Sequence, residues 1–344
     1  MKKIFMLIMA GIFLISCQKN NNNQLDTYFW EDIVPENVFK DFMAANEKIN
    51  NSSYISNEEL YSNIRYMNDG RYDIIMPSNY MVTQMHKKKI ISSIDISRLK
   101  NIDNVINSYL AQPYKTANQY GIPYLTGTIG IVINTKCVDE NDFAEWEDLW
   151  NNSYKGKIAV HDDMRDIFSI ALKSLGYSIN TMAEEEIKEA YYKLKELYPK
   201  IEIKSYNDVA DSLLNQINCI GILYNSDAYL ITKNNPDFKF IIPKEGSALW
   251  IDCFAVPKTS DNVKSAYKFI DYMIEPYTAA QVAEYTGAVP LINYNILKPY
   301  LSREMQQQYE SFFSDKNMQK MELLLDIGPV FQVYSKYFKM LLQE

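Results

Sequence analysis

The chain has 344 residues, of which 47% are hydrophobic and 23% charged, as is usual for a globular protein. Its formal net charge is −8. An acidic surface argues against nucleic acid as a partner, because nucleic acid attracts basic proteins, and it is compatible with a cationic ligand.

Residues 1–16 predict a secretory signal peptide. Two lysines precede an apolar run over residues 4–15. The run is too short for a membrane-spanning helix, which takes about 20 residues, so it is typical of a segment that is cleaved off. Cys17 directly after it matches the bacterial lipoprotein signal. We expect lipid on Cys17, a membrane anchor and a polar tether over 17–24; the alternative is an ordinary signal peptide with an incidental cysteine.

About 328 residues remain from Cys17 onward, more than one hydrophobic core usually supports, so we expect two domains. Short apolar strands alternate with amphipathic helices, a pattern that predicts α/β units with mainly parallel sheets. No glycine- and serine-rich linker divides the chain, so the two lobes should share short crossover strands. The expected strands are 27–30, 72–76, 128–134, 157–160, 219–224 and 250–256, and the expected helices are 37–47, 58–67, 163–175, 183–197 and 206–216.

The expected strand ends carry aromatic and acidic side chains. Ligands of open α/β sheets bind beyond the carboxyl ends of the strands. An alkylammonium needs carboxylates for its charged ends and flat apolar walls for its methylenes, and aromatic rings add cation–π attraction. The sequence therefore predicts a site for a cationic amine. The candidate residues at these strand ends are Trp30, Glu31, Ser78, Tyr80, Asp163, Asp166, Tyr224, Trp250 and Asp252.

Purely structural roles compete with this interpretation. Asp163 and Asp166 are spaced to cap a helix and face its dipole. A tryptophan in an apolar strand is more often a core residue, and Ser78 follows a proline, where helices begin. Asp252 resists such an explanation, because it lies in an apolar run where an unpaired buried charge is costly.

The remaining reactive residues indicate neither an enzyme nor a metalloprotein. Three cysteines remain after Cys17, namely Cys137, Cys219 and Cys253, so at most one disulfide forms between them. Each lies beside an apolar run, which predicts a small buried side chain. His86 and His161 lack metal-binding spacing, and we expect no metal and no cofactor. Nucleophile-elbow, P-loop and dinucleotide motifs are absent from the sequence. A glycosidase with two acids across a cleft is the remaining enzymatic alternative.

In ordered fragments from about Leu25 to the C-terminus, the sequence resembles the extracytoplasmic spermidine/putrescine-binding proteins of ABC importers. A single fragment is weak evidence for this family, but the occurrence of all the fragments in the same order is specific to it. The fragments that carry the resemblance are Tyr28-Phe29-Trp30, residues 72–80, Trp146-Glu147-Asp148-Leu149-Trp150, Tyr154-Lys155-Gly156, residues 162–166, Lys244-Glu245-Gly246 and residues 249–252.

The resemblance implies a two-lobed α/β fold of the periplasmic-binding-protein type II, each lobe a mainly parallel sheet flanked by helices, with crossover strands between them. We expect lobe 1 over 25–130 plus 254–298 and lobe 2 over 131–253 plus 299–344. Such lobes close on a ligand about a hinge.

The resemblance also assigns roles to the candidate residues. Trp30, Tyr80, Tyr224 and Trp250 become aromatic walls. Asp163, Asp166 and Asp252 become ammonium-binding acids, and Ser78 a polar contact.

Several positions depart from the family pattern. Asp166 replaces a usual glutamate and Tyr224 a usual tryptophan. Glu31 occupies a usual hydroxyl position and adds a carboxylate. Apolar residues replace two usual tyrosines and a usual glutamine, which leaves the length of the ligand open; they are Ile33, Ala288 and Leu324.

The expected function is that of a non-enzymatic, monomeric lipoprotein that binds putrescine, spermidine or a similar polyamine and delivers it to the permease subunits of an ABC importer. The alternatives are a binding protein for another cationic small molecule, and a surface sensor or adhesin without a role in transport.

Overall fold

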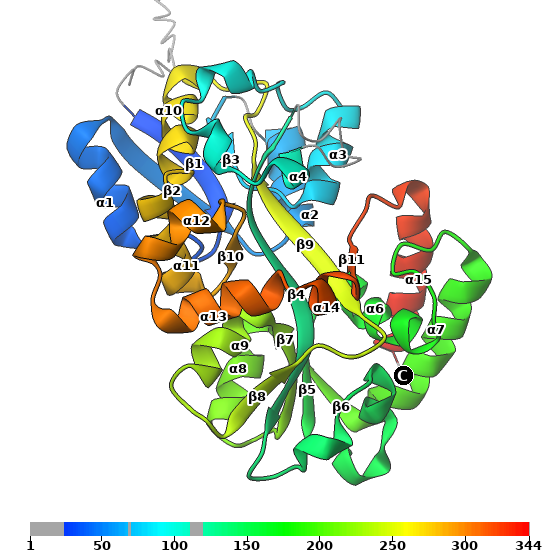
Figure 1. Ribbon diagram of the computed structural model, residues 1–344. Coiled ribbons are helices and arrows are strands. Elements are labelled where there is room, and N and C mark those ends of the chain that lie inside the picture. The colour runs from blue at the N-terminus through cyan, green and yellow to red at the C-terminus, as the bar shows by residue number, and fades with distance from the viewer. Residues whose placement is uncertain (1–23, 68–69, 111–119, 344) are drawn as a thin grey trace, which may run out of the picture.

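The computed structural model describes residues 24–67, 70–110 and 120–343. The expected signal peptide, the lipidation site Cys17 and nearly all of the tether lie outside these residues. The described chain forms two lobes, one above the other in Figure 1, which are joined by two long strands.

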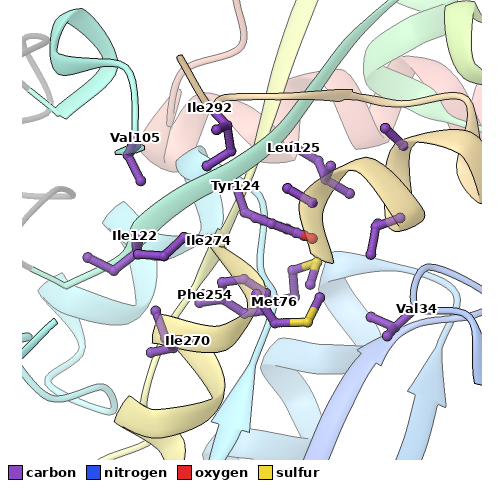
Figure 2. Packing of buried hydrophobic residues seen from close by; sticks show 14 of the residues in the cluster. Val34, Met76, Val105, Ile122, Tyr124, Leu125, Phe254, Ile270, Ile274 and Ile292 are labelled. Carbon is purple, nitrogen blue, oxygen red and sulfur yellow. The ribbon is translucent and has the colours of Figure 1, made fainter. Parts of the chain in front are cut away.

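The first lobe contains a three-stranded parallel sheet. Strand β1 (Gln24–Trp30) lies between β2 (Lys48–Tyr54) and β3 (Ile74–Ile75). Figure 2 shows part of the core of this lobe, where apolar side chains from many elements meet around Tyr124 and Phe254. The helices of this lobe are α1 (Glu36–Ala45), α2 (Asn57–Ser62), α3 (Asn79–Lys87), α4 (Asn107–Leu110), α10 (Val263–Met273), α11 (Pro276–Thr286) and α12 (Tyr294–Leu297).

Strands β4 (Ile122–Asn134) and β9 (Ser247–Phe254) run antiparallel to each other from one lobe into the other. All 13 residues of β4 are buried. Near its start β4 pairs with β10 (Val289–Pro290), and near its end with β7 (Ile220–Tyr224) and β8 (Phe238–Ile241). The crossover strands expected from the sequence are therefore present, and β4 departs from the expected parallel pattern by pairing antiparallel with all four of these neighbours.

The second lobe is built on β5 (Ile158–His161), which pairs in parallel with β6 (Ile201–Lys204) and β7. Its core packs around Trp146, Phe168 and Tyr334. The surrounding helices are α6 (Met164–Ser174), α7 (Glu184–Leu197), α8 (Tyr206–Leu214), α9 (Asn225–Thr232) and α15 (Phe331–Leu341). Strand β11 (Met321–Leu323) extends the sheet beside β9.

The expected lobe boundaries remain a prediction. Helix α13 (Arg303–Phe312) and the short α14 (Asp315–Met318) fall in the part expected in lobe 2. However, Met305, Tyr309 and Phe312 pack in the same cluster as the first-lobe residues of β1 and α1. This packing argues for placing α13 with the first lobe.

The structure corrects one expectation about the cysteines. Cys137 and Cys219 form a disulfide between the turn after β4 and the start of β7, within the limit of one that the odd count sets. Cys137 is exposed and Cys219 half-buried, so they are not the buried side chains that were predicted. Cys253 is a free thiol and is buried, as expected. Over the described ranges no helix is long and apolar enough to cross a membrane.

Candidate functional site

The first part of the candidate site is a buried carboxyl at the junction of β9 and α3. Asp252 lies in β9 and is 6% exposed. Its Oδ1 accepts a 2.7 Å hydrogen bond from the hydroxyl of Ser78, the residue that precedes α3. Ser78 therefore does not use its side chain to cap the helix. Burial raises the pKa of Asp252 to about 7, although the hydrogen bond from Ser78 favours the charged form.

Asn57, at the start of α2, holds two of the candidate residues in place. Its Nδ2 donates to the Ser78 hydroxyl at 3.1 Å and to the Tyr80 hydroxyl at 2.9 Å. Its Oδ1 accepts from the Ser78 backbone N–H at 3.2 Å. Asn57 is 5% exposed, and these three bonds use both of its amide hydrogens and its oxygen.

The second acidic group lies at the end of β5 and the start of α6. Asp163 caps α6, because its Oδ1 accepts from the Asp166 backbone N–H at 2.9 Å. Asp166 does not cap the helix. Its Oδ2 accepts hydrogen bonds from the Tyr224 hydroxyl at 2.6 Å and from His161 Nε2 at 2.8 Å. The structural and functional interpretations of Asp163 are thus compatible.

Acidic side chains of the two lobes lie close enough at the start of α6 to affect each other's ionisation. Burial, the charge of Asp166 and, least, the charge of Glu58 of the first lobe together raise the pKa of Asp163 to about 6. The Tyr80 hydroxyl on α3 lies in the field of Asp163 and Glu58, and burial together with these charges raises its pKa. Residues of α2, α3 and α6 therefore lie near one another where the two lobes meet.

Aromatic rings line the region between the acidic groups. Trp30, at the end of β1, packs on Tyr54 with ring centroids 4.7 Å apart. Trp250 of β9 meets Tyr224 edge to face at 5.8 Å. Both tryptophans are only partly buried, unlike ordinary core residues. Gly127 on β4 makes room for the Trp250 ring, because a Cβ there would overlap it.

The positions that depart from the family pattern fall into three environments. Glu31 is exposed beside Trp30, on the rim rather than inside. Ala288 belongs to the core of the first lobe, and the partly buried Ile33 packs against that core. Leu324 is buried with Ile179 and Ala248, against the rings of Tyr80 and Trp250. The position at which the resemblance implies a glutamine is thus part of an apolar cluster beside two of the candidate rings.

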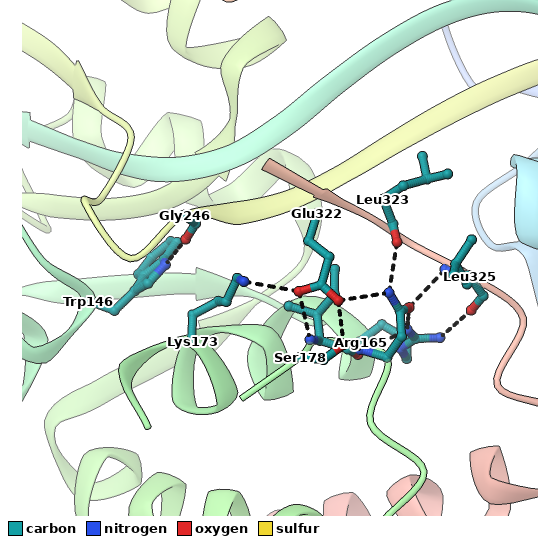
Figure 3. A network of polar contacts seen from close by, with 10 residues as sticks. Trp146, Arg165, Lys173, Ser178, Gly246, Glu322, Leu323 and Leu325 are labelled. Carbon is teal, nitrogen blue, oxygen red and sulfur yellow. Dashed lines mark hydrogen bonds and ion pairs between the residues drawn. The ribbon is translucent and has the colours of Figure 1, made fainter. Parts of the chain in front are cut away.

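Leu324 lies in a segment that contacts both lobes, which we call the strap (residues 322–326). Figure 3 shows its contacts with the second lobe: Glu322 with Lys173 and Ser178, Leu323 with Asn180, and the Leu325 carbonyl with Arg165. On the other side, Asp326 pairs with Lys87 of α3 at 2.7 Å. The Leu324 carbonyl accepts from Asn79 at 2.7 Å.

The sequence analysis missed three residues of this site, Asn57, Glu58 and His161. An asparagine and a glutamate at a helix start look like ordinary capping residues, so only the structure singles them out. His161 carried a usable signal, since a histidine at a strand end beside two aspartates is a candidate partner for them. In the part of the chain that the structure describes, no cluster of histidine, cysteine and acidic side chains is arranged to hold a metal.

Comparison with known proteins gives consistent matches. A family model described as bacterial extracellular solute-binding protein matches residues 37–306. The spermidine/putrescine-binding periplasmic protein of Escherichia coli K12 is 32% identical over 339 residues, which cover 97% of each chain. The spermidine/putrescine-binding periplasmic protein 1 of Haemophilus influenzae is 30% identical and matches 92% of this chain and 88% of that protein.

Solved structures confirm the fold. A spermidine/putrescine ABC transporter substrate-binding protein of Streptococcus pneumoniae matches with a TM-score of 0.80 and 30% identity. The match covers 93% of this chain and 99% of that one. The two-lobed α/β fold of the periplasmic-binding-protein type II, expected from the resemblance, is therefore confirmed.

Proposed function

Because the chain belongs to the bacterial extracellular solute-binding protein family, we propose that it binds a polyamine such as putrescine or spermidine between its lobes and delivers it to an ABC importer. The observation that carries this proposal is the pairing of two separated acidic groups with aromatic rings between them. In this proposal Asp252 binds one ammonium group, and Asp163 with Asp166 binds the other. This arrangement matches a dication with a methylene spine.

The proposal gives each candidate residue a role. The carboxylates bind ammonium groups by charge-assisted hydrogen bonds. The rings of Trp30, Tyr80, Tyr224 and Trp250 pack on the methylenes and attract the charges through their faces. Glu31, exposed at the rim, attracts cations toward the opening. Binding proteins of this family carry their solute to a transporter, so no catalytic residue is assigned.

Titration calorimetry of the soluble chain from residue 18 onward tests the proposal. The panel holds putrescine, cadaverine, spermidine and 1,4-butanediol, which has the length of putrescine but no charge. We expect at least one amine to bind with a Kd in the micromolar range, which corresponds to about −8 kcal/mol, and no binding of the diol. Binding of the diol, or of none of the amines, contradicts the proposal.

The anchor and the oligomeric state need separate tests. We propose that Cys17 carries the lipid that tethers the protein outside the cytoplasm, and that the protein acts as a monomer. Cells fed labelled palmitate should incorporate the label into the native chain and not into Cys17→Ala. Light scattering of the soluble chain should give the mass of one copy, with and without amine. A labelled Cys17→Ala chain or a dimer mass refutes the corresponding statement.

A further inference from the structure

His161 is buried at the end of β5, and both of its ring nitrogens face acceptors. Nε2 lies 2.8 Å from Asp166 Oδ2, and Nδ1 lies 3.2 Å from the backbone carbonyl oxygen of Ile222. A neutral imidazole has one N–H and can satisfy only one of these acceptors, whereas the imidazolium donates to both. The geometry therefore favours the charged form.

The charges around His161 support the same protonation state. Burial disfavours the cation, but the hydrogen bond and charge of Asp166, together with Asp163, raise the pKa of His161 to about 9. Tyr224, the last residue of β7, donates to the same Asp166 oxygen at 2.6 Å. Arg165 on α6 directs its guanidinium toward the Leu325 carbonyl, and Glu58 on α2 faces Asp163.

Asp166 thus already accepts hydrogen bonds from protein side chains in the absence of a ligand. Its Oδ2 accepts two hydrogen bonds, one of them from a cation, and both it and His161 are about 2% exposed. Asp163 has no such counter-ion among its hydrogen-bond partners here, since its Oδ1 accepts from a neutral backbone N–H. The two aspartates therefore offer the ligand's ammonium unequal attraction.

We propose that His161 is a specificity-determining residue, whose imidazolium offsets the charge of Asp166 and so limits the affinity of this end of the site for an ammonium group. The inference rests on the proposed function. A bound ammonium and the imidazolium repel each other across Asp166. By linkage, ligand binding must then lower the pKa of His161, and protonation of His161 must weaken ligand binding.

His161→Gln tests this role, because glutamine keeps an N–H donor for Asp166 but carries no charge. His86→Gln is the matched control, since His86 packs on the Tyr120 ring at 3.9 Å, outside the site. Putrescine titrations from pH 6 to 10 give the ratio of the variant's affinity to that of the native protein. The ratio cancels the ionisation of putrescine itself.

We expect His161→Gln to bind putrescine about tenfold more tightly than the native protein at pH 7, equivalent to a one-unit fall in the pKa of His161 on binding. The ratio should approach one above pH 9, and His86→Gln should match the native protein throughout. NMR of the two histidines should place the His161 pKa above 8 in the free protein. It should fall when putrescine is added.

Four results overturn the inference. A ratio that does not change with pH, or tighter binding by the native protein, leaves His161 with a structural role only. A His161 pKa below 6.5 in the free protein removes the imidazolium without any reference to the ligand. Failure of the native protein to bind any amine defeats the proposed function and this role together, whereas binding with a constant ratio defeats this role alone.

Discussion

The hydroxyl of Ser78 donates a 2.7 Å hydrogen bond to Asp252 Oδ1 across 174 positions of sequence. The bond joins the start of α3 to β9, where an isolated bridge also links the two backbones. A carboxyl held in this way is buried and oriented, and among the described residues it forms no ion pair. These are the properties that a site for an ammonium group requires.

Asp252→Asn should abolish most of the ligand binding. If Asp252 pairs with a desolvated ammonium, losing its charge costs about 2–5 kcal/mol of affinity. Calorimetry with putrescine and spermidine measures the change, and Asp261→Asn, at an exposed position, is the control. A loss below about 0.5 kcal/mol would place Asp252 outside the site.

The same substitution should stabilise the empty protein in a pH-dependent way. The pKa of Asp252 is raised from 3.8 to about 7, so the folded state holds its proton more tightly than the unfolded state does. Ionisation of Asp252 therefore lowers the free energy of unfolding. This destabilisation is absent below pH 3.8 and complete above pH 7. In urea unfolding, the free energy of unfolding of Asp252→Asn minus that of the native chain should rise between pH 4 and 7. The total rise should be on the order of a few kcal/mol. An advantage that shrinks with rising pH would contradict the assignment.

Asn57→Ala should weaken amine binding although Asn57 itself bears no charge. The substitution removes partners of Ser78 and Tyr80, and a buried polar group without a partner costs about 1–3 kcal/mol. We expect roughly a tenfold weaker Kd together with a lower Tm. Asn50→Ala, at an exposed position of β2, should change neither quantity. Unchanged affinity in Asn57→Ala would mean that Ser78 and Tyr80 need no positioning.

Gly127→Ala should displace the Trp250 ring. An added Cβ would overlap that ring and Asn225 Oδ1, so the aromatic wall has to shift. We expect weaker amine binding and a changed tryptophan fluorescence. Gly130→Ala on the same strand instead meets Phe240 of the second lobe, so it should lower the Tm without changing the Kd. Equal effects of the two substitutions on the Kd would argue against a specific role for Trp250.

Reduction of the Cys137–Cys219 disulfide should destabilise the second lobe. The bond closes a loop between residues 82 positions apart, which is worth about 4 kcal/mol in the chain-entropy model. Urea unfolding with and without reductant measures the difference, and Cys137→Ser with Cys219→Ser should match the reduced protein. Thiol titration of the unfolded soluble chain should find one free thiol, Cys253. Three free thiols would show that the disulfide does not form.

The sequence predicted the elements whose residues alternate or repeat in a regular way. Strand β5 and helices α6 and α7 were found within a residue or two of their expected limits. Strand β2 was missed, because its polar sequence from Lys48 to Tyr54 carries little hydrophobic signal, and only its pairing with β1 makes it a strand. The sequence allowed one disulfide but did not identify its partners, since Cys137 and Cys219 meet only after β4 and β7 have paired.

The residues of the candidate site could be predicted from the sequence, but the hydrogen bonds between them could not. The aspartates and aromatic rings end strands, and strand ends can be recognised in a sequence. The bonds from Asn57 to Ser78 and Tyr80, and from His161 to Asp166, depend on how α2 packs on α3 and how β5 leads into α6. The order of residues along the chain does not show how these elements pack.

The strap is attached differently to its two neighbours. To the second lobe it is joined by a network in which Glu322 alone bonds Lys173, Ser178 and the Ile179 backbone. Among the described residues, its one ionic link to the first lobe is Asp326 with Lys87, whose side chain is 60% exposed, beside hydrogen bonds from Asn79 and Gln84. Salt weakens exposed pairs most, so when the lobes part the strap should travel with the second lobe, and raising the ionic strength should favour the parted form.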